Sequence, residues 1–320
     1  MVGTVKRLEG GKPKWGRRAL VGGGVLGAAA VGIYRQAPLF WKQYPTEMFR
    51  PIEDAPHRPE PRQWADSGLA AAWLGHATCL VKLDGMVILT DPVFSPRCGI
   101  DMAVTTLGPK RMVKPALAIE ELPKVDLVLL SHAHFDHWDL PSLGKLASKG
   151  TEVICARQTS DLLTIPHWKQ VRELGWGERV RVGPLEVTGV EVKHWGARVR
   201  RDTHRGYNGY VVEAAGGKFL FGGDSAFTDK FKAVRGGRPI DLAIMPIGAY
   251  RPWLQNHCTP EQAIQMVDWA GAERILPVHH KTFVLSAEPV AEPIERFVAG
   301  LGNNEARGVA TDVGMEWAAS

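Results

Sequence analysis

Cysteine is scarce in this chain of 320 residues. The four cysteines, Cys79, Cys98, Cys155 and Cys258, form no C-x-x-C motif, which argues against a thiolate metal site and against a disulfide framework. Internal repeats are also lacking, and low-complexity sequence is confined to the glycines near the N-terminus. No Ser-His-Asp triad is evident, so catalysis by an activated serine is not indicated.

Net positive charge is lacking outside the N-terminal region. The chain carries a formal net charge of +5, but residues 1–50 hold nine Lys or Arg against two Asp or Glu, which leaves −2 for the remaining 270 residues. That balance gives no support for nucleic-acid binding. The basic N-terminal region instead favours contact with an anionic membrane surface.

The N-terminal region also contains sixteen uncharged residues, 19–34, preceded by six Lys or Arg. This pattern is short for a membrane span but fits a signal peptide or an uncleaved signal anchor, and a disordered leader rich in Gly and Ala is the alternative. An anchor would place the chain at a bacterial inner membrane, with the domain that follows in the periplasm or, alternatively, at the cytoplasmic face. We expect a leader over 1–35, a linker over 36–66, extended by its prolines, and one domain over 67–320.

Composition and hydrophobic patterning predict a layered α/β domain. With 45% hydrophobic residues, the chain can bury a substantial core. Strands are expected at 69–73, 78–83, 86–90, 126–130, 151–155, 179–193, 207–214, 218–222, 241–245 and 274–278, and helices near 139–148, 228–235, 260–270 and 290–300. Runs of strands followed by interspersed helices favour two sheets covered on their outer faces.

The most informative segment is the turn His132-Ala-His-Phe-Asp-His137, directly after an apolar strand. His132 and His134 can converge on one cation, while Asp136 and His137 can reach a second. Imidazole with carboxylate suits zinc, and also manganese or iron. Burying four such groups without a metal would be costly. The turn therefore predicts a two-metal site.

One turn cannot complete two coordination spheres, so further ligands must come from elsewhere. His194, Asp224 and His279 each lie just beyond a predicted strand, where loops build sites on a rigid sheet. Two glycines before Asp224 allow the backbone to turn tightly. These three residues are the candidate additional ligands.

Together these motifs resemble the metallo-β-lactamase superfamily, whose fold is a four-layer αββα sandwich. A narrower similarity, from about Trp64 to Phe283, is to N-acyl-phosphatidylethanolamine-hydrolysing phospholipase D and its bacterial relatives. It is carried by Trp73–Thr78, Leu89–Ser95, Ser131–His137, His194-Trp195, Gly223–Ser225, Ile247–Tyr250, His257 with Thr259–Ala263, and His279 with Thr282-Phe283.

The resemblance implies two Zn²⁺ ions per chain, with Mn²⁺ or Fe²⁺ as other candidates. It assigns His132, His134 and His194 to the first ion, Asp136, His137 and His279 to the second, and Asp224 with a hydroxide to both. The family has an aromatic residue where this chain has His280, so the last ligand is open between His279 and His280. The spacing to Thr282-Phe283 favours His279.

Other residues have predicted supporting roles. Asp136, Asp224 and His257 are the residues expected to take part in catalysis. His257 precedes the predicted helix start Thr259–Gln262, which reads as a capping box, and it would orient substrate or be structural. His76 is expected to hydrogen-bond a metal ligand, and Asp91 to do so or to brace its loop.

The loop after His194 is rich in arginine, including Arg198 and Arg200. These two would bind a substrate phosphate through guanidinium geometry, or form a solvated face.

The predicted function is hydrolysis of a phospholipid phosphodiester by metal-activated hydroxide. A lactonase or other carboxyl-ester hydrolase is the alternative, because the same site would polarise a carbonyl. A membrane-tethered protein that binds metals without turnover is a third possibility. The family resemblance also implies a homodimer.

Overall fold

The computed structural model describes residues 38–101, 106–199 and 201–319. The chain divides into two compact units, Met1–Pro45 and Thr46–Ser320. The predicted leader over 1–35 lies outside the described residues. The first described helix is α2 (Pro38–Phe49). In the ranges that the structure describes, no helix is long and apolar enough to cross a membrane.

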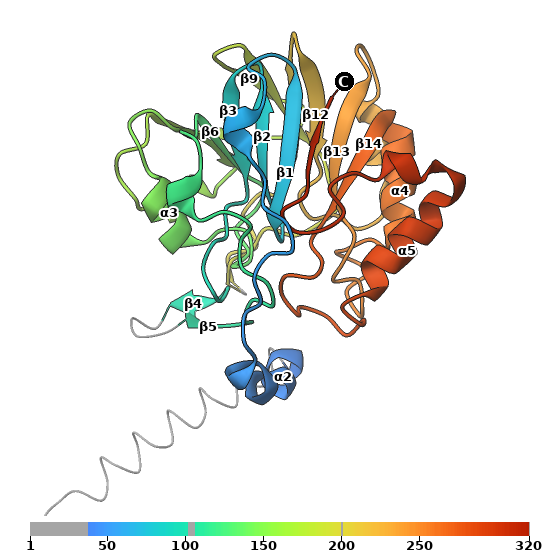
Figure 1. Cartoon of the computed structure of the whole chain (residues 1–320). Coiled ribbons are helices and arrows are strands. Elements are labelled where there is room, and N and C mark those ends of the chain that lie inside the picture. Colours follow the sequence, from blue (N-terminus) through green and yellow to red (C-terminus); the bar gives the residue numbers. More distant parts are fainter. Residues whose placement is uncertain (1–37, 102–105, 200, 320) are drawn as a thin grey trace, which may run out of the picture. The chain divides into compact units, whose positions relative to one another are not determined.

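The second unit is built on two mixed sheets (Figure 1). The first has seven strands in the order β15-β1-β2-β3-β6-β7-β8, in which β3, β6, β7 and β8 run parallel. Their bounds are β1 Leu69–Gly75, β2 Thr78–Leu83, β3 Met86–Thr90, β6 Leu127–Leu130, β7 Glu152–Ala156, β8 Gln170–Leu174 and β15 Glu316–Ala318.

The second sheet has six strands in the order β14-β13-β12-β11-β10-β9, with β12, β13 and β14 parallel. Their bounds are β9 Arg179–Val182, β10 Leu185–Val190, β11 Gly209–Ala214, β12 Gly217–Phe221, β13 Ile240–Pro246 and β14 Ala272–Val278. A separate small hairpin pairs β4 (Ile100–Asp101) with β5 (Thr106–Leu107).

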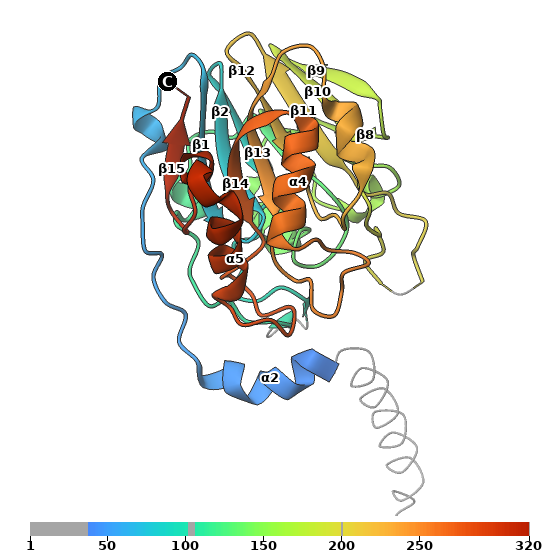
Figure 2. The same ribbon diagram turned by 90° about the vertical axis from the view of Figure 1, so that its right-hand side faces the viewer.

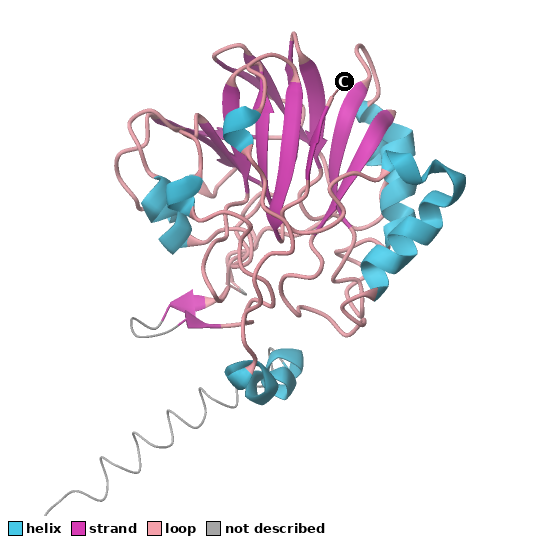
Figure 3. Cartoon of the chain, in the orientation of Figure 1, coloured by secondary structure: helices cyan, strands magenta, loops and turns pink. Residues whose placement is uncertain are grey.

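Helices flank the two sheets, as Figure 3 shows. The α-helices are α3 (Leu140–Leu146), α4 (Pro260–Ala270) and α5 (Glu292–Leu301), and the 3-10 helices are Pro61–Gln63, Ile119–Glu121, Ser160–Leu162, Asp229–Val234 and Gly302–Arg307. Both α4 and α5 cover β13 and β14 (Figure 2), where Met245, Val267 and Phe297 share one buried cluster. The opposite flank carries α3, so the predicted αββα layering is confirmed.

The main core lies between the sheets. Trp73 from β1 and Phe219 and Phe221 from β12 are completely buried in one apolar cluster with residues of both sheets. The hydroxyl of Tyr210 on β11 donates to the carbonyl of Leu130 on β6 at 2.8 Å. This bond joins the second sheet to the strand that leads into the His-rich turn, and therefore helps to fix that turn.

Helix α4 begins and ends as its sequence predicts. The Thr259 backbone N–H donates to Oε1 of Gln262 at 3.0 Å, and the Gln262 backbone N–H donates to Oγ1 of Thr259 at 3.4 Å. Gly271 ends the helix with a left-handed φ of +75°. The predicted capping box is thus confirmed.

Other predicted elements were wrong in detail. The run 179–193 is not one strand but the hairpin β9–β10, because Gly183 adopts a φ of +57° and Pro184 follows it. Residues 228–235 form a 3-10 helix in place of an α-helix. Strands β8 and β15 and the β4–β5 hairpin were not predicted.

The proline-containing stretch after α2 is hydrogen-bonded to the sandwich. The backbone N–H of Glu53 donates to the carbonyl of Met112 at 2.8 Å, and that of His57 donates to the carbonyl of Val313 at 3.2 Å. Residues 53–57 therefore lie along the domain.

Candidate metal centre

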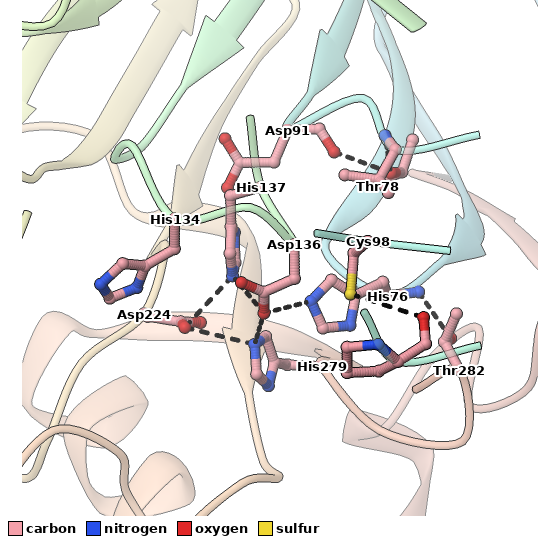
Figure 4. A network of polar contacts seen from close by, with 12 residues as sticks. His76, Thr78, Asp91, Cys98, His134, Asp136, His137, Asp224, His279 and Thr282 are labelled. Carbon is pink, nitrogen blue, oxygen red and sulfur yellow. Dashed lines mark hydrogen bonds and ion pairs between the residues drawn. The ribbon is translucent and has the colours of Figure 1, made fainter. Parts of the chain in front are cut away.

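The candidate ligands all lie in loops at one end of the sandwich, each after the carboxyl end of a strand. They come from both sheets: His132, His134, Asp136 and His137 follow β6, His194 follows β10, Asp224 follows β12 and His279 follows β14. The predicted substrate-orienting residue, His257, lies in the loop after β13. Figure 4 shows several of these side chains pointing toward one another. The fold thus gathers residues as distant in sequence as His132 and His279.

The first ligand group consists of His132, His134 and His194. Nδ1 of His134 lies 2.8 Å from Nε2 of His132 and 3.3 Å from Nε2 of His194. Burial, followed by repulsion from His194, lowers the pKa of His134 to about 3, and burial also lowers the pKa of His132 and of His194. Three neutral imidazoles with converging nitrogens are suited to hold one cation.

The second group consists of Asp136, His137 and His279, with His76 beside them. Nε2 of His137 lies 3.5 Å from Oδ2 of Asp136, and Nε2 of His279 lies 3.4 Å from the same oxygen. This group mixes nitrogen and carboxylate ligands, which suits zinc and also other first-row metals.

Asp224 lies between the two groups. Its Oδ2 is 3.2 Å from Nε2 of both His137 and His279 (Figure 4), and 3.8 Å from Nε2 of His194. The carboxylate is only 3% exposed, and although burial raises its pKa, His137 and His279 hold that pKa well below the ordinary value. Asp224 is therefore placed to be shared by two cations.

Unpartnered atoms test whether metals fit this site. Among the described residues, Oδ1 of Asp224 and Nε2 of His137 and of His279 are buried without a hydrogen bond. Buried polar atoms are normally satisfied, and here three of them lie in one His and Asp cluster. The residues present therefore fit a two-metal centre, a class of site that the sequence also predicts.

The outward-facing nitrogens of three candidate ligands have identified partners. Nδ1 of His137 lies 2.6 Å from Oδ2 of Asp91, Nδ1 of His132 lies 2.8 Å from Oγ of Ser131, and Nδ1 of His194 donates to the carbonyl of Asn256 at 2.8 Å. Such bonds fix the tautomer and the ring orientation of a ligand. No motif points to Asn256, because it acts through its backbone carbonyl.

His76 contacts the second group directly. Its Nε2 lies 3.0 Å from Oδ2 of Asp136, and its ring is 4.2 Å from that of His279. Burial, then the proximity of His279, lowers the pKa of His76 to about 3. A neutral His76 is therefore placed to donate to the Asp136 carboxylate.

The backbone around the cluster is strained. His76, Asp91 and His279 have positive φ values of 54°, 31° and 64°, which side-chain-bearing residues rarely adopt. Gly223, before Asp224, also has a positive φ, and a Cβ there would lie 2.7 Å from the carbonyl oxygen of Asn208. Strain at several loop ends is typical of a preorganised site.

The structure distinguishes His279 from its neighbour. His279 faces Asp136 and Asp224, whereas the ring of His280 packs against Trp73 with centroids 4.5 Å apart. Both ring nitrogens of His280 are buried without a hydrogen bond among the described residues. The geometry places His279, and not His280, in the ligand cluster.

His257 lies at the edge of the cluster. Its Nδ1 is 3.8 Å from Oδ2 of Asp224, and its side chain is 13% exposed, whereas the side chains of His132, His137, His194 and His279 are at most 1% exposed. This position suits the predicted role of orienting substrate.

The arginine-rich loop is largely engaged with the protein. Arg198 donates from one nitrogen to the carbonyls of Ala133 and Trp138, and its guanidinium lies 4.2 Å from the ring centroid of Phe135. Arg205 pairs with Asp161 and Asp202. Arg198 therefore braces the His-rich turn, while Arg200 lies outside the described residues.

We expect metal binding to release protons. Burial lowers the pKa of His279, but Asp224 and Asp136 outweigh it and raise that pKa to about 9 in the metal-free protein, and they also hold the pKa of His137 well above its ordinary value. Cations must displace these protons, so apparent affinity should increase as pH rises toward about 9. Calorimetric titration with Zn²⁺ at pH 7, in two buffers of different ionisation enthalpy, measures the release. Zero release would mean that both rings are neutral.

The sandwich carries a candidate two-metal centre of His and Asp residues at one end, and comparison with known proteins gives its family. Residues 87–280 match the β-lactamase superfamily domain. The chain belongs to the metallo-β-lactamase superfamily.

Its relatives include both uncharacterized proteins and named enzymes. An uncharacterized Mycobacterium tuberculosis protein is 33% identical over 242 residues, which cover 73% of this chain and 64% of that protein's length. The N-acyl-phosphatidylethanolamine-hydrolyzing phospholipase D 1 of Caenorhabditis elegans is 31% identical over 283 residues, covering 80% of this chain and 77% of the relative.

A solved structure agrees on the fold. The metallo-β-lactamase fold protein of Bacillus subtilis aligns with a TM-score of 0.54 at 16% identity, over 78% of this chain and 99% of that one.

Proposed function

We propose that this protein is a two-zinc phosphodiesterase of the phospholipase D type, acting on phospholipids similar to N-acyl-phosphatidylethanolamine. The observation that carries a two-metal reaction is the position of Asp224 between both ligand groups. The lipid substrate is supported by the 31% identity to the nematode enzyme over 80% of the chain.

The ligand side chains would bind two zinc ions. His132, His134 and His194 would hold one zinc, Asp136, His137 and His279 the other, and Asp224 both. When bound, the pair supplies Lewis acidity and a water of lowered pKa.

His257 lies at the edge of the cluster, where its ring can contact a bound substrate. Burial, in the first place, lowers its pKa to about 3, so it is neutral at pH 7 and offers substrate a hydrogen bond without a charge.

Exposed apolar side chains near the cluster favour a lipid over a sugar lactone. Trp195 is 43% exposed while its ring packs edge-on against His134, and Trp253 and Leu254 are 40% and 53% exposed in the loop that carries His257. Large apolar residues left in water beside a reactive site are suited to contact an apolar substrate.

Replacing Trp253 and Leu254 together by serine should weaken the use of lipid more than the chemistry. We expect turnover of phospholipid in vesicles to fall about 30-fold, since each of the two side chains contributes on the order of 1 kcal/mol when half its apolar surface is buried. Hydrolysis of soluble bis(p-nitrophenyl) phosphate should be nearly unchanged. Steady-state rates on both substrates decide it, and equal losses would show that the loop serves the metal site alone.

The function itself is tested by a substrate panel. The zinc-loaded protein is assayed side by side against N-acyl-phosphatidylethanolamine, phosphatidylcholine, soluble phosphodiesters and sugar lactones. Release of phosphatidic acid from the first substrate, abolished by a chelator and restored by zinc, is the expected result. Preference for lactones would indicate a carboxyl-ester hydrolase. The absence of turnover on every substrate would favour a protein that binds metals without catalysis.

We also propose that the basic and apolar leader tethers the enzyme to a bacterial inner membrane. Deleting residues 1–35 should release the protein into the soluble fraction and lower turnover of vesicle lipid, because tethering raises the local concentration of enzyme at its substrate. The rate on a soluble phosphodiester should stay nearly constant. Equal loss on both substrates would mean that the leader is part of the fold.

A further inference from the structure

The loop between β13 and α4, residues 247–259, supplies two groups to the metal centre. Its Asn256 carbonyl accepts the Nδ1–H of His194 at 2.8 Å, and its His257 faces Asp224. The end that carries these groups is closed by two backbone bonds, from the N–H of Asn256 and of His257 to the carbonyl of Trp253. Contacts that hold the rest of this loop in place therefore also help to orient His194.

The other half of the loop is anchored at Arg251, whose carbonyl accepts the Ala287 N–H at 2.9 Å and whose guanidinium pairs with Glu292. One buried carboxylate takes the backbone N–H groups of this half. Glu288, which is 8% exposed, accepts the backbone N–H of Tyr250 at 3.2 Å through Oε1 and that of Arg251 at 3.0 Å through Oε2. Ser286 also donates its hydroxyl to Oε1 at 2.6 Å. A carboxylate that accepts several hydrogen bonds in a buried place holds its donors more firmly than a neutral acceptor would.

No other described side chain takes these two N–H groups. The backbone of Tyr250 is buried, with the residue only 2% exposed, so removal of the carboxylate would leave the Tyr250 N–H a buried donor without a partner. A buried donor left unpaired destabilises the conformation that leaves it so. The loop would shift to recover hydrogen bonds, and the Asn256 carbonyl lies only five residues beyond Arg251.

The two ligand groups differ in their dependence on this loop. His194 is oriented by Asn256, whereas His137 is oriented by Asp91 and Asp136 contacts His76, neither of which belongs to the loop. The loop also adjoins His279, but without a hydrogen bond to its ring: the His257 ring lies 5.4 Å from that of His279, and the Ile247 N–H donates to the carbonyl of Val278 at 3.0 Å. A disturbance of the loop should therefore weaken the first group more than the second.

We propose that Glu288 is a positioning residue that, through the β13–α4 loop and the Asn256 carbonyl, sets the affinity of the metal site formed by His132, His134 and His194. It touches neither metal ligand nor substrate. This inference rests on the proposed two-metal centre. Loss of Glu288 should lower the metal affinity of one site more than that of the other. A general loss of stability would not produce this difference.

The test is a metal titration of the full-length protein, prepared metal-free, with Co²⁺ followed by its visible absorption and Zn²⁺ followed by calorimetry. Glu288→Ala should weaken one of the two binding steps about 10–100-fold, the range seen when a group that orients a ligand is lost, and leave the other step within about twofold. Glu288→Gln keeps one carbonyl oxygen for one of the two N–H groups and should lie between Glu288→Ala and the parent. It also serves if the alanine variant fails to fold.

Ser286→Ala is the matched control. It removes a hydrogen bond to the same carboxylate but leaves both backbone N–H groups paired, so both binding steps should match the parent. Unchanged affinities in both Glu288 variants, or equal weakening of both steps alongside a lower unfolding temperature, would overturn the inference. A parent protein that binds no metal would instead remove the proposed function on which it rests.

Discussion

Replacing Asp224 by alanine should remove bound metal and abolish hydrolysis while the sandwich remains folded. The carboxylate lies 3.2 Å from the inner nitrogens of both His137 and His279 and 3.8 Å from that of His194, so neither ligand group is complete without it. We expect a rate loss on the order of 10³-fold or more, which corresponds to about 4 kcal/mol of transition-state stabilisation. Elemental analysis of metal content and hydrolysis of a soluble phosphodiester measure the two effects.

Asp224→Asn provides the control for size and shape. It keeps one oxygen ligand but loses the negative charge, and we expect it to retain part of the metal and little of the activity. The circular dichroism of both variants should match the parent, because the removed group lies in a loop beyond β12 and not in the core between the sheets. Two metals per chain with intact activity in Asp224→Ala would contradict the shared role.

Substitutions at the adjacent histidines should have opposite outcomes. His279→Gln removes a nitrogen that faces both Asp136 and Asp224, so we expect loss of one metal per chain and of nearly all activity. His280→Phe should preserve both, since a phenyl ring can keep the packing that His280 makes against Trp73 and removes two buried nitrogens that lack hydrogen bonds.

A metal titration of the two variants separates the alternatives. If His280→Phe lost the metal and His279→Gln retained it, the ligand role would pass to His280 and the geometry of the loop after β14 would have to be different. The thermal unfolding temperature of His280→Phe should equal or exceed that of the parent, because a buried polar group is replaced by an apolar one of similar size.

The sequence predicts the site better than it predicts the sheets. The candidate ligands could be found because each follows an apolar strand, and the carboxyl ends of β6, β10, β12 and β14 meet at one end of the fold. The alternating pattern of residues 179–193 predicts one strand because it continues across Gly183-Pro184, where the chain in fact reverses. Strand β8 was missed because it lies at a sheet edge and is mostly half-exposed, so its pattern is weak.

Residues that support the site were harder to find than those that form it. Asn256 acts through its backbone carbonyl, which leaves no trace in residue type. The sequence predicts that Arg198 binds a phosphate, and its hydrogen bonds to the carbonyls of Ala133 and Trp138 could not be predicted from the sequence. Glu288 lies nine residues after His279, in a stretch without a recognisable motif. Such contacts depend on how loops pack, which periodicity and spacing do not encode.

The origin of the ligands in both sheets makes metal supply a determinant of folding stability. One ligand-bearing loop follows β6 in the first sheet, and the other three follow β10, β12 and β14 in the second. A cation bound between them bridges the two halves of the sandwich and is lost when they separate. At a free concentration 100 times its dissociation constant, each independent ion would stabilise the native state by about 2.7 kcal/mol. A cell starved of metal would therefore hold a protein that is more easily unfolded and degraded.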